Sequence, residues 1–95
     1  MKDERIKNLN YVIDEITTKY KITDLNEIEN IHHKKSEQYK QKLNGDTWKY
    51  LENCSIKTNE LFGFSTTILT SIESSGYKLL YTCMCIKILD ELLER

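Results

Sequence analysis

The chain has 95 residues, 39% of them hydrophobic and 31% charged, and its 14 basic and 15 acidic side chains leave a net charge of −1. This composition is typical of one folded domain, residues 1–95, with a heavily charged surface, and it excludes a disordered segment. Non-specific nucleic-acid binding draws on an excess of positive charge, which the chain as a whole lacks.

The cellular location is predicted from the start of the chain and from its cysteines. The N-terminal residues are charged and lead into no apolar run, which argues against a secretory signal. The uncharged stretch 61–72 is too short and too polar to span a bilayer. Three cysteines, an odd number, indicate reduced thiols and not a disulfide framework: Cys54, Cys83 and Cys85. We therefore expect a cytoplasmic protein without a membrane segment.

The first predicted helix covers residues 3–20, with Asp3 in its first turn or at its cap. Large apolar residues recur there in steps of three and four, the spacing of one helix face: Ile6, Leu9, Ile13, Ile16 and Tyr20. The stripe is narrow, as in coiled-coil-like packing. The chain contains no proline, which removes the strongest helix breaker.

A second helix is predicted over residues 25–43, after a short break near 21–23. Its face is only weakly apolar, and a single bent helix is the alternative at the break. Its end is better defined, because Asn44-Gly45-Asp46 combines a left-handed glycine with a capping aspartate.

The second half of the chain is predicted to hold two more helices. Steps of three and four continue from Trp48 to Ile72, residues 73–76 have a turn composition, and the last helix covers 77–94. This gives an all-α bundle of three to four helices. The alternative is an α+β fold with a C-terminal β-hairpin over residues 64–88, because Thr, Ile, Tyr and Cys are frequent there.

Catalytic and metal chemistry find little support in the motifs. On helices, the neighbours His32 and His33 point about 100° apart and Cys83 and Cys85 about 200° apart, so neither pair converges on one ion. The glycines are isolated, and no nucleophile motif surrounds the cysteines. We expect no metal, no cofactor and no enzymatic activity.

Nucleic-acid binding is the alternative function. Residues 32–42 are locally basic and carry four lysines that together are expected to face phosphates: Lys34, Lys35, Lys40 and Lys42. No arginine fork for reading guanine accompanies them.

Protein binding is the favoured function. The last helix is apolar over most of its circumference, which predicts self-association through that helix as a dimer or higher oligomer. Aromatic and aliphatic residues of the second half are the predicted partner-binding set: Trp48, Tyr50, Phe62, Phe64, Tyr77, Tyr81, Met84 and Ile88. In size, charge balance and helical character the chain is similar to bacteriocin-immunity and phage-encoded inhibitor proteins. That general resemblance implies a regulator or inhibitor that occupies a partner's surface.

Overall fold

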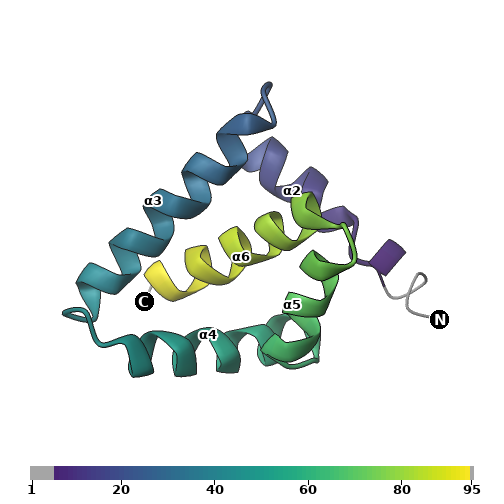
Figure 1. Cartoon of the computed structure of the whole chain (residues 1–95). Helices are drawn as coiled ribbons and strands as arrows, with labels where there is room; N and C mark the ends of the chain where they lie inside the picture. Colours follow the sequence, from purple (N-terminus) through teal and green to yellow (C-terminus); the bar gives the residue numbers. More distant parts are fainter. Residues whose placement is uncertain (1–5, 95) are drawn as a thin grey trace.

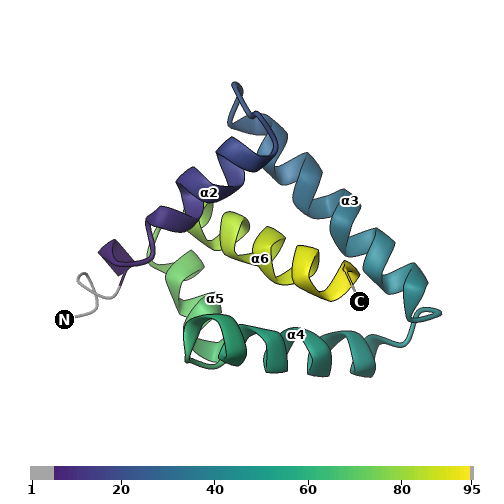
Figure 2. The same cartoon turned by 180° about the vertical axis from the view of Figure 1, so that it is seen from behind.

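The structure is a computed structural model that describes residues 6–94 (Figures 1 and 2). Within that range the chain forms five helices and no strand, labelled as in Figure 1: α2 (Tyr11–Lys19), α3 (Asn26–Lys42), α4 (Thr47–Phe62), α5 (Thr66–Ser74) and α6 (Lys78–Leu93). The predicted all-helical class is confirmed. The predicted number of three to four helices is wrong, and so is the alternative with a β-hairpin over 64–88.

The predicted first helix is interrupted, and its buried stripe is wider than predicted. Ile6 and Lys7 are helical, residues 8–10 form turns in which the amide of Leu9 donates to the carbonyl of Ile6 at 3.0 Å, and α2 then begins at Tyr11. The predicted cap, Asp3, lies outside the described residues. The ladder does face the core, but Val12 is fully buried beside it. The helix therefore packs through a broad face and not along a narrow seam.

The two predicted breaks on either side of α3 are confirmed. Lys21 has a left-handed φ of 52°, which ends α2, and Asp24 Oδ1 then accepts from the amide of Asn26 at 3.0 Å. After α3, Gly45 has a φ of 79° and Asp46 Oδ1 accepts from the amide of Lys49 at 3.0 Å. These are the left-handed glycine and the capping aspartate that the sequence predicts.

The fifth helix of the described residues arises because the predicted helix from Trp48 to Ile72 is broken at Gly63. The apolar spacing continues across this break and does not reveal it. Gly63 has a φ of 74°, a left-handed conformation that glycine adopts without the steric cost of a side chain. Ser65 is extended, and its carbonyl accepts from the amide of Ile68 at 3.1 Å to start α5. The chain therefore turns between α4 and α5 where the hydrophobic spacing alone suggests a single helix.

The centre of the fold is α6, which contacts α2, α3, α4 and α5 and lies inside the frame that they form (Figures 1 and 2). Nine of its residues are buried: Leu80, Thr82, Cys83, Met84, Ile86, Ile88, Leu89, Asp90 and Leu92. Each large apolar side chain buried there contributes about 1.5–3 kcal/mol. Four helices of the same chain cover the apolar circumference, so it no longer argues for self-association through α6.

A buried carboxylate fixes α6 to two of its neighbours. The side chain of Asp90 is only 7% exposed, and its oxygens lie 2.7 Å from Lys35 Nζ and 3.1 Å from Lys19 Nζ. The hydroxyl of Tyr20 donates to the same carboxylate at 2.6 Å. Burial alone would raise the pKa of Asp90, but the hydrogen bonds from Lys35, Tyr20 and Lys19 hold that pKa below its ordinary value. The carboxylate therefore stays ionised and ties α2, α3 and α6 together.

Substitution Asp90→Asn should lower the free energy of unfolding by about 2–3 kcal/mol, because the two ammonium groups lose their buried counter-charge. The loss should stay below that of a fully buried pair, since the Lys19 side chain is 49% exposed. Urea denaturation measures it. Glu94→Gln is the matched control, because the exposed Glu94 reaches Lys19 only at 4.0 Å, and its effect should stay within about 0.5 kcal/mol. Equal effects of the two substitutions would contradict this role of Asp90.

The stabilisation that Asp90 gives the fold should also depend on pH and should be lost in acid. A carboxyl whose folded-state pKa lies below its ordinary value of 3.8 stabilises the fold above that pH. This stabilisation is lost as the pH falls through the folded-state pKa. Urea titrations at about pH 7, 4 and 2.5 should therefore show the wild type and Asp90→Asn converging only below about pH 4. Convergence already between pH 7 and 5 would be inconsistent with a lowered pKa.

Candidate functional site

A groove of about 690 Å³ lies between α3, α4, α5 and α6. Side chains of all four helices line it, among them the buried Thr58 of α4, Leu69 of α5 and Leu89 of α6. The lining is mainly apolar or weakly polar: His32, Ser36, Trp48, Tyr50, Leu51, Glu52, Cys54, Ser55, Thr58, Thr66, Leu69, Thr70, Tyr81, Cys85, Ile88 and Leu89. We refer to this hollow as the α4 groove, because α4 contributes the most residues to it.

One flank of α4 leaves large apolar side chains in water at the edge of the α4 groove. Trp48 is 85% exposed and Leu51 54% exposed. The face that α4 turns toward the core instead carries Tyr50, Cys54 and Leu61, which pack against the buried cluster. Because successive residues of a helix are rotated by about 100°, Trp48 and Leu51 lie beside this inner face and not on it. The N-terminal half of the stripe predicted from the sequence is therefore uncovered.

Few polar groups interrupt the apolar lining. The hydroxyl groups of Ser36 and Tyr50 share a hydrogen bond of 2.8 Å, which links α3 to α4. Burial lowers the pKa of His32, and the charge of the neighbouring His33 lowers it further, so a neutral imidazole is favoured. Within residues 6–94, no three His, Cys, Asp or Glu side chains are placed to hold a metal ion together. The lining suits the burial of apolar surface more than coordination chemistry.

The thiols of the α4 groove are poorly suited to nucleophilic chemistry. Burial raises the pKa of Cys54 to about 11 and that of Cys85 to about 12. Cys83 is fully buried in the core, and burial raises its pKa to about 11. A thiol of this kind is almost entirely protonated at neutral pH, whereas the reactive species is the thiolate.

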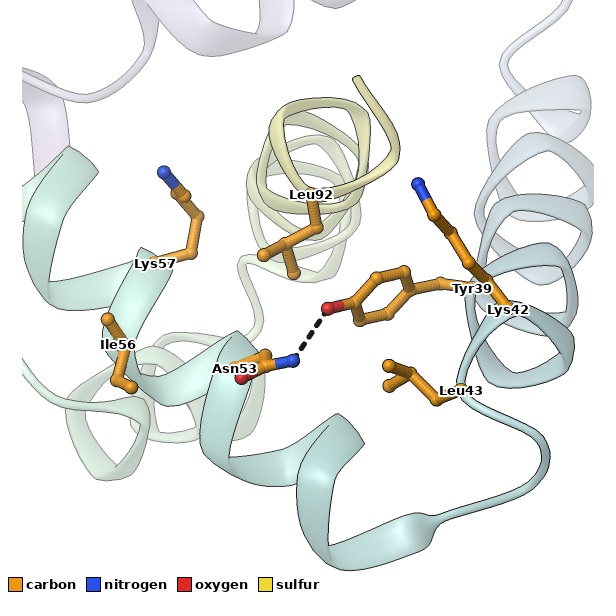
Figure 3. A pocket seen from close by; sticks show the side chains of 7 residues that line it. All are labelled: Tyr39, Lys42, Leu43, Asn53, Ile56, Lys57 and Leu92. Carbon is orange, nitrogen blue, oxygen red and sulfur yellow. Dashed lines mark hydrogen bonds between the residues drawn. The ribbon is translucent and has the colours of Figure 1, made fainter. Parts of the chain in front are cut away.

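A smaller hollow of about 290 Å³ lies on the other flank of α4, near the end of α6 (Figure 3). The amide of Asn53 donates to the hydroxyl of Tyr39 at 2.8 Å. Lys57 is buried, and its ammonium group pairs with Glu60 at 2.6 Å. Because these polar groups are already bonded within the chain, this hollow offers less to an apolar ligand than the α4 groove does.

The structure separates the predicted partner-binding residues into three groups. Trp48 and Tyr77 are exposed, the latter at 38%. Tyr50, Phe62 and Tyr81 are half-buried, and Phe64, Met84 and Ile88 are buried in the core. The α4 groove brings together four of the eight: Trp48, Tyr50, Tyr81 and Ile88. Leu51 was missed, although its position three residues after Trp48 on the same stripe was a usable signal.

The four lysines of the nucleic-acid alternative do not act as one free cationic face. Lys34 is exposed, but Lys35 is paired with the buried Asp90. Lys40 lies 3.9 Å from Glu37 Oε1 and 5.3 Å from the ring centroid of Tyr50. Lys42 donates to the carbonyl of Leu93 at 3.5 Å. Three of the four thus contact their own chain.

No helix among residues 6–94 is long and apolar enough to cross a membrane.

The cysteines should react slowly with iodoacetamide in the native protein. A pKa near 11 in place of about 9 lowers the thiolate fraction at pH 8 roughly a hundredfold, and the higher nucleophilicity of a more basic thiolate offsets part of this. Alkylation followed by mass spectrometry should therefore be at least tenfold slower than in urea. A cysteine modified at the same rate in both states would instead identify a reactive thiol.

Comparison of the chain with protein-family models, with curated proteins and with solved structures found no match. The α4 groove, with the exposed side chains of Trp48 and Leu51 at its edge, is the feature of the described surface best suited to a binding partner.

Proposed function

We propose that the protein binds another protein through the α4 groove and regulates or inhibits that partner by occupying its surface. One observation carries the proposal: the 85% exposed Trp48 stands at the edge of a groove of about 690 Å³. Tryptophan is among the side chains that contribute most to protein interfaces, above all beside a pocket that excludes water. An isolated exposed tryptophan would carry less weight than one next to an apolar hollow.

The groove best fits the apolar face of an amphipathic helix. It is bordered by helices, and α6 lines it with side chains such as Cys85, Ile88 and Leu89. Backbone hydrogen bonds in such a partner are satisfied within the partner helix itself, so an apolar groove need supply only packing contacts. An extended peptide would need an exposed strand edge, and residues 6–94 contain no strand.

A non-enzymatic role and a cytoplasmic location belong to the same proposal. The three thiols are free, and the raised pKa values of Cys54 and Cys85 favour packing over catalysis. Free thiols suit a reducing compartment. The cationic alternative is weaker, since Lys35 is already bound to Asp90.

Selection of helical peptides from a displayed library tests the proposal. The chain contains a single tryptophan, Trp48, so its fluorescence reports directly on the groove. A selected peptide should shift the emission to shorter wavelength, and Trp48→Ala and Leu51→Ala should each weaken binding by roughly tenfold or more. The matched control is Leu25→Ala, since Leu25 is 57% exposed but outside the groove.

The proposal requires that binding depend on the groove. A library that yields no binder would contradict it, as would binders that are equally affected by Leu25→Ala and Leu51→Ala. Circular dichroism of each variant should match the wild type, because all three side chains are more than half exposed.

A further inference from the structure

The uncovered flank of α4 carries a large and a small side chain on the same line of the helix. Trp48 and Ser55 lie on one line of the helix, two turns apart. The large indole protrudes at one end of this line, and the small, half-buried Ser55 leaves room at the other. Leu51 lies between them and is 54% exposed. A protrusion and a recess on the same line are self-complementary when two copies run antiparallel.

We propose that the helix bound at the α4 groove is α4 of a second copy, in an antiparallel, two-fold symmetric dimer; this inference rests on the proposed function. An axis midway between Trp48 and Ser55 sets each indole over the serine of the other copy, at the edge of its groove. The same axis brings the two Leu51 side chains together. The contact is isologous, so both copies bury the same surface and the assembly closes at two.

Charge supports the same arrangement. Lys49 and Glu52 are exposed beside this line of α4, Glu52 among the residues that line the groove, and neither forms an ion pair within residues 6–94. In an antiparallel pair related by a two-fold axis, equivalent flanks of the two helices face each other. Lys49 of each copy then lies near Glu52 of the other, and two reciprocal ion pairs form. In a parallel pair the two-fold axis runs along the helices, so this flank of one copy faces the opposite flank of the other and Lys49 does not meet Glu52.

Sedimentation velocity over a concentration series tests the dimer. The wild type should form a dimer, and Trp48→Ala should raise its dissociation constant roughly a hundredfold because the contact is lost from both copies. Leu25→Ala, exposed but distant from α4, should leave the constant unchanged. A wild type that stays monomeric up to about 1 mM would overturn the inference.

Charge reversal tests the antiparallel register. Lys49→Glu and Glu52→Lys should each raise the dissociation constant by roughly tenfold at low salt, because like charges then face each other. An equimolar mixture of the two variants should restore wild-type affinity, since every facing pair is again of opposite charge. Single variants that dimerise like the wild type, or a mixture that does not recover, would overturn the register.

A monomeric chain that still binds selected peptides through Trp48 would refute the dimer and leave the proposed function intact. Failure of both assays would remove both.

Discussion

The apolar circumference of α6 is the constraint on which the rest of the structure depends. A helix that buries Leu80, Ile86 and Leu92 on different sides needs neighbours all around it. α2, α3, α4 and α5 supply that cover, and the chain turns sharply between them at Lys21, Gly45 and Gly63. The carboxylate of Asp90 then adds direction to this non-directional packing, since it accepts only where Lys19, Tyr20 and Lys35 converge.

Covering α6 leaves α4 incompletely covered. α4 uses Tyr50, Cys54 and Leu61 to pack against the core, so the neighbouring flank with Trp48 and Leu51 has no helix over it. The same arrangement opens the α4 groove between the supporting helices. The apolar surface available to a partner thus follows from how the core is enclosed, and it lies on α4 instead of α6.

Local signals made much of the fold predictable from sequence. The ladder from Ile6 to Tyr20 and the Asn44-Gly45-Asp46 turn identified helix faces and ends, because they depend on spacing and backbone preference alone. The break at Gly63 was hidden, since the hydrophobic spacing runs on across it. The sequence also could not predict which face of α4 is buried. An apolar stripe shows that a face is suited to burial, but tertiary packing decides whether another element covers it. Trp48 and Met84 therefore looked equivalent in sequence, although one is 85% exposed and the other fully buried.

The chain encloses α6 and leaves one flank of α4 open, and this claim is tested most directly by comparing Trp48 with Met84. Hydroxyl-radical footprinting oxidises exposed methionine and tryptophan side chains and is read by mass spectrometry. At a protein concentration at which sedimentation velocity finds only monomer, Trp48 should be oxidised at least tenfold faster than Met84 in the native state, and urea should abolish the difference. Oxidation of native Met84 as fast as in urea, or protection of Trp48 in the monomer, would contradict the account.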